Sequence, residues 1–106
     1  MSQEFSPDQS GYVYFRNTSG IVRDAYFDLM QKTKASSALD PKTFELVYVA
    51  YLGAIKNYSG IEVHVKRAKE HGATREEVES VMLCGIGLIG ATHTDAYKLA
   101  MTAYDD

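Results

Sequence analysis

The sequence is poor in cysteine, and this limits its chemistry. Among its 106 residues there is one cysteine, Cys84, so the chain cannot form an intrachain disulfide. The N-terminal stretch also lacks the basic, apolar and small-residue succession of a secretory signal peptide. Together these absences predict a protein of the reducing cytoplasm.

Long apolar runs and a strong net charge are absent as well. The longest apolar run, Val81 to Ala91, contains three glycines and is too short to span a bilayer. A net charge of −3 gives no electrostatic reason to expect nucleic acid or an anionic membrane as a partner. The three histidines have no Glu or Asp at a metal-ligand spacing, and nothing in the sequence points to a cofactor.

The composition is that of a small globular protein. The chain is 45% hydrophobic and 24% charged, and its length predicts one domain that buries a smaller share of its surface than a larger protein does. Residues 1–20 could form a short strand, a helical turn or an arm that lies on a neighbour. We favour an N-terminal arm that docks, because the aromatic cluster at Tyr12, Tyr14 and Phe15 would be adhesive if left in water. Residues 21–106 then form the helical domain.

The clearest helix start lies at Pro41. Asp40 is suited to cap it, proline fits the first helical position, and Leu39 with Phe44 can form a hydrophobic staple. The helix is apolar almost all round, which predicts burial on every face, either centrally or under a partner subunit. Glu45 is its only carboxylate and must be paired, hydrogen-bonded or neutral if it is buried.

A second helix follows after a short break. Ser59 with Glu62 predicts a capping box, and the apolar face of this helix includes His64. The short connection predicts that the two helices are antiparallel neighbours. Spacing alone leaves open whether Glu45 meets His64 directly, through water or through another subunit.

Further helices are predicted on both sides of this pair. One runs from Ile21 to about Lys34, one starts at the capping box of Thr74 with Glu77, and a last one is capped by Thr92 with Asp95. The glycines at the end of the helix that starts at Thr74, Gly85, Gly87 and Gly90, predict the close approach of another backbone. The fold class is therefore all-α, with five or six helices in a single domain.

The run from Leu39 to Val81 contains a set of positions with a recognisable pattern: Leu39-Asp40-Pro41-Lys42-Thr43, Glu45, His64 and Gly72-Ala73-Thr74-Arg75-Glu76-Glu77. At these positions the run resembles the carboxymuconolactone decarboxylase superfamily, which includes the alkylhydroperoxidase D-like proteins. The resemblance implies an all-helical bundle that assembles as a homotrimer or homohexamer. It also implies chemistry on a small carboxylate or lactone.

The sequence departs from the family pattern at three positions. Asn57 and Gly60 stand where the alkylhydroperoxidase branch has its Cys-x-x-Cys pair, so these positions offer neither a thiolate nor a disulfide. Phe44 stands where the decarboxylase branch usually has arginine, which bears on how a polycarboxylate lactone would bind. These departures argue against the peroxidase branch more strongly than against the decarboxylase branch.

The candidate catalytic residues are His64 and Glu45. His64 is either a core histidine bonded to a carbonyl or a general acid/base, and Glu45 is either part of a structural ion pair or the group that orients the imidazole. Tyr48, Tyr51, Tyr58 and Asn57 are the candidate substrate-binding residues, although core packing is the commoner use of tyrosines.

Three functions follow, in order of preference. The first is a cofactor-free lyase of the carboxymuconolactone decarboxylase type. The second is a thiol peroxidase that would depend on Cys84, which otherwise behaves as a small hydrophobe. The third is a non-enzymatic oligomer that binds a small anion or a protein. His71 is expected to cap a helix end, and His93 receives no role.

Overall fold

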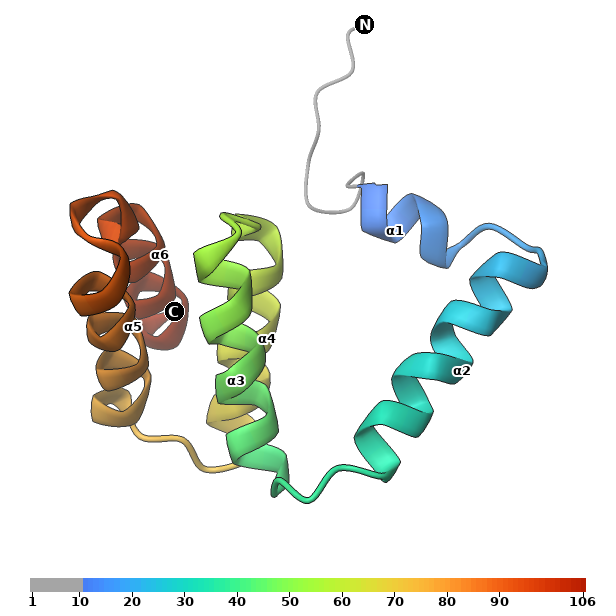
Figure 1. Ribbon diagram of the computed structural model, residues 1–106, viewed down its shortest axis with the longest axis horizontal. Helices are drawn as coiled ribbons and strands as arrows, with labels where there is room; N and C mark the ends of the chain where they lie inside the picture. The colour runs from blue at the N-terminus through green and yellow to red at the C-terminus, as the bar shows by residue number, and fades with distance from the viewer. Residues whose placement is uncertain (1–10) are drawn as a thin grey trace, which may run out of the picture. The chain divides into compact units, whose positions relative to one another are not determined.

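The computed structural model describes residues 11–106, and all regular secondary structure in that range is helical (Figure 1). Six α-helices and one short 3-10 helix occur among these residues, which confirms the predicted fold class. The chain separates into two compact units, Met1–Ser37 and Ala38–Asp106. The predicted boundary after residue 20 stays a prediction.

The first unit contains helices α1 (Gly11–Arg16) and α2 (Ile21–Ala35). Rings from the two helices pack on each other: Tyr12 lies 6.2 Å from Phe27, and Phe15 lies 5.5 Å from Tyr26, between ring centroids and both edge to face. The aromatic cluster of the predicted arm is therefore partly engaged by its own unit. Residues 1–10 of that arm lie outside the described residues.

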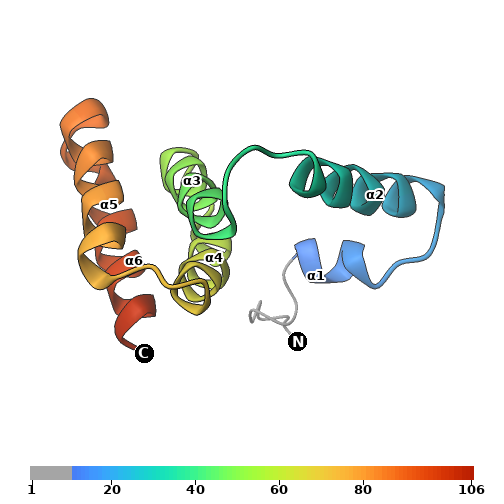
Figure 2. The same cartoon turned by 90° about the horizontal axis from the view of Figure 1, so that it is seen from below.

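The second unit is a four-helix arrangement. Its helices are α3 (Pro41–Ala54), α4 (Tyr58–Glu70), α5 (Arg75–Ile89) and α6 (Thr94–Asp105), with the 3-10 helix Ala91–His93 between the last two. Helices α3 and α6 each pack against both α4 and α5, as Figures 1 and 2 show. The core between them consists mainly of small and branched side chains: Val49, Ile61, Val65, Ala68, Val78, Met82, Ala96 and Ala100.

Two of the predicted helix starts are confirmed. The Asp40 carboxylate accepts hydrogen bonds from the Thr43 backbone at 3.3 Å and the Thr43 hydroxyl at 2.6 Å. In the capping box of α5, the Glu77 amide donates to Thr74 Oγ1 at 3.1 Å, and the Thr74 amide donates to Glu77 Oε1 at 2.9 Å. Both ends satisfy amides that have no partner inside the helix.

The cap of α4 differs from the prediction. Lys56 has a positive φ of 62°, and this turn places Asn57, not Ser59, before the first helical residue. Asn57 Oδ1 accepts from the Gly60 amide at 3.3 Å. The helix thus begins two residues earlier than a Ser59 cap requires, because an asparagine side chain caps as well as a serine.

The start of α6 differs too. The chain makes a 3-10 turn at Ala91–His93, α6 begins at Thr94, and no side chain of the described residues caps it. Thr92 therefore does not cap the last helix. This turn carries His93 into the bundle, where only 4% of it is exposed.

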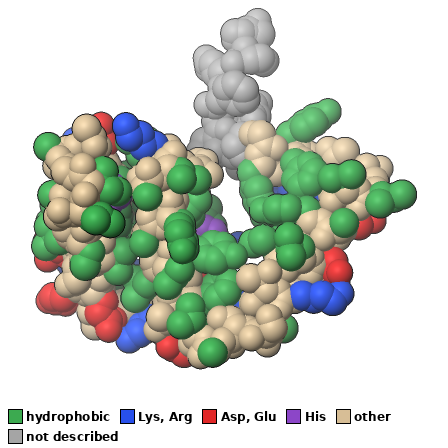
Figure 3. Space-filling view, in the orientation of Figure 1, with side chains coloured by type: hydrophobic (Ala, Val, Ile, Leu, Met, Phe, Trp, Pro, Cys, Tyr) green, Lys and Arg blue, Asp and Glu red, His purple; other side chains and the backbone are tan. Residues whose placement is uncertain are grey.

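Within the described residues of one chain, helix α3 is not buried on every face, and its predicted cover by a partner subunit stays a prediction. Phe44, Glu45, Val49 and Gly53 are buried, whereas Tyr51 is 69% exposed. Figure 3 shows hydrophobic side chains at the surface of both units. No helix within residues 11–106 is both long and apolar enough to cross a membrane.

Of the glycines in α5, Gly85 makes room for a side chain from elsewhere in the fold. A Cβ at Gly85 would overlap the His93 imidazole, and a Cβ at Gly53 on α3 would lie 3.0 Å from His93 Cε1. Gly87 has open space around it. The predicted close approach is therefore real at Gly85, but the approaching group is an imidazole ring.

Candidate functional site

Glu45 on α3 and His64 on α4 meet directly. Glu45 Oε1 lies 2.6 Å from His64 Nδ1, across 19 positions of sequence. The packing of α3 on α4 brings them together, because both residues face the same helix contact. Of the three arrangements that the sequence left open, the structure shows the direct one.

The two partners differ in burial. The Glu45 side chain is 2% exposed and that of His64 is 17% exposed. A buried ionised carboxylate is tolerated when it accepts strong hydrogen bonds, and an ionised carboxylate only accepts. With Glu45 ionised, Nδ1 carries the proton and donates it, so Glu45 fixes both the tautomer and the orientation of the ring.

The second ring nitrogen of His64 is available. Within residues 11–106, Nε2 has no hydrogen-bond partner. In the neutral ring this nitrogen holds the free lone pair, and the partial exposure of His64 lets a small molecule reach it. The pair therefore combines a buried carboxylate with a ring nitrogen that is accessible to solvent.

An aromatic stack supports the imidazole. The Tyr48 ring centroid lies 5.1 Å from that of His64 at an interplanar angle of 43°, and Phe44 stacks on Tyr48 at 4.7 Å. Phe44, at the position where the resembling decarboxylases carry arginine, thus packs against the site's tyrosine. Of the candidate substrate-binding residues, Tyr48 is the one that the structure brings against His64.

The side chains of Asn57 and Tyr58 take part in helix capping and core packing. Asn57 Oδ1 accepts from the Gly60 amide and the Ser59 hydroxyl, both at 3.3 Å, so its side chain is engaged at the α4 cap. Tyr58 is half-buried and packs against the core of the second unit. Their predicted contact with substrate stays a prediction.

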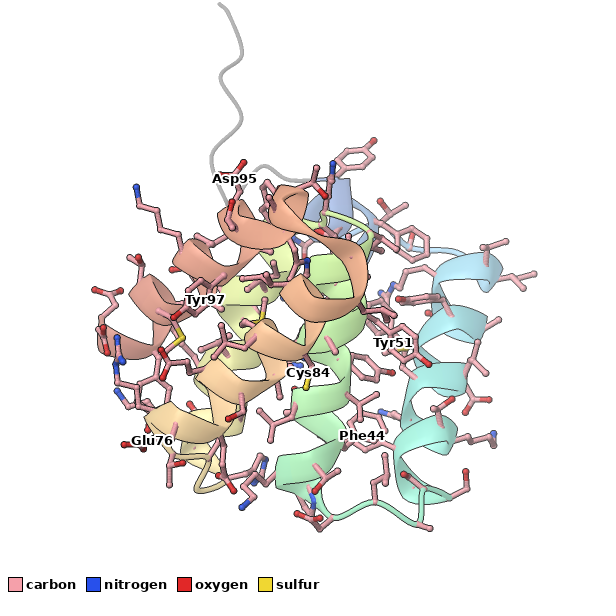
Figure 4. All side chains as sticks on the ribbon, turned by 60° about the vertical axis from the view of Figure 1, so that its left-hand side comes forward. Phe44, Tyr51, Glu76, Cys84, Asp95 and Tyr97 are labelled. Carbon is pink, nitrogen blue, oxygen red and sulfur yellow. The ribbon has the colours of Figure 1, made fainter. Side chains whose placement is uncertain are left out.

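Tyr51 belongs to a different part of the surface. It lines a pocket of about 380 Å³ between α3 and α5, and Figure 4 shows it on α3 with Cys84 on α5. The remaining lining residues are Val47, Ala50, Ala54, Val81, Gly85, Leu88, Ile89 and His93. At about 100° per residue, Ala54 lies roughly half a turn around α3 from Glu45, so the pocket and the Glu45–His64 pair occupy opposite sides of this helix.

Sequence reasoning missed His93. It is buried against Gly85 and Gly53 and lines the pocket, whereas the sequence assigned it to a connection without a role. The signal for it was Gly85, a helical glycine that requires a close neighbour. Which neighbour this was could not be read from the helix itself.

An ion pair joins the N-terminal turns of α3 and α5. Lys42 Nζ lies 2.9 Å from Glu77 Oε2. Hydrogen bonding from the Thr74 backbone, followed by the Lys42 ammonium, holds the pKa of Glu77 below its usual value.

Three or more His, Cys, Asp or Glu side chains do not gather at any point of residues 11–106 in a way that could hold a metal ion.

Comparison with known proteins shows the family to which the chain belongs. The model of the carboxymuconolactone decarboxylase family matches residues 22–100. A protein of Paracoccus denitrificans described as "Uncharacterized protein 4 in cox locus" is 33% identical over 86 residues, which are 80% of this chain and 77% of the relative. No solved structure is significantly similar. The chain belongs to the carboxymuconolactone decarboxylase family.

Proposed function

We propose that the protein is a cofactor-free lyase of the carboxymuconolactone decarboxylase type that acts on a small carboxylated or lactone substrate. His64 is the general acid/base, and Glu45 is the residue that positions it. The observation that carries this proposal is the 2.6 Å contact between Glu45 Oε1 and His64 Nδ1, with Nε2 left accessible.

Decarboxylation requires a group that protonates the carbon from which CO2 has left. When the bond to a carboxylate breaks, CO2 leaves, and the electron pair stays on the substrate as an enolate conjugated with its carbonyl. His64 Nε2 first takes a proton from solvent, and Glu45 stabilises the imidazolium that results. The enolate carbon then takes this proton, which returns His64 to its neutral form. Tyr48 is proposed as the donor to the developing oxyanion because its ring lies against His64.

The proposal is tested with carboxymuconolactone and simpler carboxylated lactones as substrates, by following CO2 release. Loss of His64 in His64→Ala should lower kcat by about 10²- to 10⁴-fold, the range for a lost general acid/base. His71→Gln is the matched control, because His71 is exposed at the end of the same helix. Equal turnover in His64→Ala and the parent enzyme would contradict the proposal.

Self-assembly is proposed on the same family grounds, as a homotrimer or homohexamer. It is supported by exposed apolar side chains on α2, where Ile21 is 86%, Val22 75% and Leu29 60% exposed. Large exposed apolar patches commonly mark interfaces. Sedimentation of the parent chain and of Ile21→Lys tests this: a trimer or hexamer that the substitution breaks supports it, and a monomeric parent excludes it.

A thiol peroxidase is the alternative, and one observation favours it. Cys84 is exposed and lines the same pocket as His93. Its thiolate would attack the hydroperoxide, releasing alcohol and forming a sulfenic acid that an added dithiol reduces. Hydroperoxide consumption with a dithiol, in the parent and in Cys84→Ser, decides between the two chemistries. A non-enzymatic binding oligomer remains if neither reaction occurs.

A further inference from the structure

The buried imidazole of His93 lies at the wall of the pocket between α3 and α5. His93 is 4% exposed and lines the pocket, yet its side chain has no hydrogen-bond partner within residues 11–106. In the same residues, no fully buried side-chain nitrogen or oxygen is left unpaired, so the ring nitrogens retain access to solvent. The pocket provides that access.

The position of this ring is built into the helices. Its Nε2 edge occupies the space that a side chain would need at Gly85, and its Cε1 approaches the corresponding position of Gly53. Two glycines on facing helices thus make the room for one imidazole. Water in the pocket can bond to the ring nitrogens, and a ligand that displaces this water must replace its hydrogen bond.

The rest of the lining is almost entirely apolar. Aliphatic side chains of α3 and α5 form the walls, Tyr51 and Cys84 add a hydroxyl and a thiol, and the described residues contribute no Lys, Arg, Asp or Glu to the lining. A carboxylate would lose its hydration there and find a single imidazole in return, which is a poor exchange. The volume of about 380 Å³ is at the lower end for small-molecule sites.

We propose that this pocket binds a small neutral molecule with an apolar body and one hydroxyl group, and that the hydroxyl bonds to His93. A hydroxyl suits the site because it both donates and accepts, so it pairs with either nitrogen of a neutral imidazole. The site is separate from the Glu45–His64 pair, which lies on the opposite side of α3. It therefore stands or falls independently of the lyase proposal.

The test compares three ligands that share one propylphenyl body: 4-propylphenol, propylbenzene and 4-propylbenzoate. Calorimetric titration of the full chain should show 4-propylphenol binding roughly three- to tenfold tighter than propylbenzene, which is what one net hydrogen bond contributes. The benzoate should bind more weakly than the phenol. A benzoate that binds most tightly, or no binding by any of the three, overturns the proposal.

Two variants locate the binding. His93→Leu should remove the preference for the phenol while propylbenzene still binds. Ala54→Phe should abolish the binding of both, because Ala54 is exposed at the pocket and a phenyl ring there fills it. Ala35→Phe, at an exposed position that does not line the pocket, is the matched control. Unchanged phenol binding in Ala54→Phe overturns the assignment of the site.

A direct readout does not depend on how the variants fold. In the parent protein labelled with ¹⁵N, the ring nitrogen signals of His93 should shift on adding 4-propylphenol and stay nearly unmoved on adding propylbenzene. His64→Ala should show the same shifts. If the His64 signals respond to the phenol and those of His93 do not, the ligand binds elsewhere and the proposal fails. A pocket closed by a second copy of the chain would show no shift at either histidine, which also refutes it.

Discussion

Glu45 Oε1 and His64 Nδ1 lie 2.6 Å apart, with the carboxylate almost fully buried and the imidazole partly open. The two side chains of the pair therefore differ in their access to solvent. The buried partner is fixed by packing and does not reach solvent, whereas the exposed partner presents its far nitrogen outward. An acid/base pair requires such access to its reacting nitrogen, and the proposed role of His64 depends on it.

The first prediction concerns the negative charge of Glu45. Glu45→Gln keeps the shape and the hydrogen-bonding capacity of the side chain but no longer stabilises an imidazolium. We expect a loss of at least about 10- to 100-fold in kcat, the range for groups that orient the histidine ligands of a metal, with KM little changed. Steady-state kinetics measures this split.

The control for Glu45→Gln is the pH profile of kcat. The variant should change the shape of this profile, because the charge that favours the protonated imidazole has been removed. A purely structural role for Glu45 would instead lower the thermal transition and leave the profile of the remaining activity unchanged. That result would contradict the positioning role.

The sequence could predict the residues of the Glu45–His64 pair but not their contact. Glu45 and His64 were singled out because a lone carboxylate in an apolar helix and a histidine on an apolar face both require a partner. Their direct contact depends on the lateral offset of α3 and α4, which spacing along the chain does not contain. The turn at Lys56, with φ of 62°, sets that offset.

His93 shows the opposite case. Its burial comes from the 3-10 turn at Ala91–His93, which rotates the chain before α6 begins. Turns of the 3-10 type are frequent at helix ends, so the local sequence did not distinguish this turn from a helix capped at Thr92. Helix existence was thus predictable at this end of the chain, and the position of one side chain was not.

The second prediction concerns the two readings of Asn57. As a cap, Asn57→Ala should destabilise the protein by about 1 kcal/mol, and Asn57→Ser should restore most of that. Thermal unfolding of both variants measures this. If Asn57 also contacts substrate, as the sequence suggested, Asn57→Ser will raise KM although the cap is kept. An unchanged KM in Asn57→Ser would leave Asn57 with the cap alone.

The third prediction is a pH dependence of stability. The pKa of Glu77 is lowered in the folded protein, first by the Thr74 backbone and then by Lys42. A lowered folded pKa means that the ionised group stabilises the fold above its unfolded pKa, near 4.5, and that this stabilisation is lost as the pH falls through the folded value. Glu77→Gln should therefore be less stable than the parent at pH 7.

The same comparison at low pH supplies the control. Below the folded pKa of Glu77 both proteins carry a neutral side chain at this position, so their unfolding curves in urea should converge. In a Lys42→Met background, Glu77→Gln should cost less stability than in the parent chain but still cost some, because the Thr74 amide remains as a donor. A gap between parent and Glu77→Gln that is the same at every pH would show that the carboxylate charge is not responsible.

The fourth prediction tests the room made for His93. A Cβ at Gly85 would overlap the imidazole, so Gly85→Ala should destabilise the fold by about 1 to 3 kcal/mol, the usual cost of overpacking a core. Gly87→Ala is the matched control on the same helix, since its surroundings are open. It should stabilise the protein by up to about 1 kcal/mol through helix propensity. Chemical denaturation measures both.

A double substitution separates steric overlap from any other effect of Gly85→Ala. In the His93→Ala background the imidazole is gone, so Gly85→Ala should cost little or become favourable, as at Gly87. The difference between the two backgrounds is the interaction free energy of Gly85 with His93. An equal cost in both backgrounds would mean that the cost does not come from the His93 ring. An equal gain in both would mean that the ring moves aside freely, and either result would contradict the packing described.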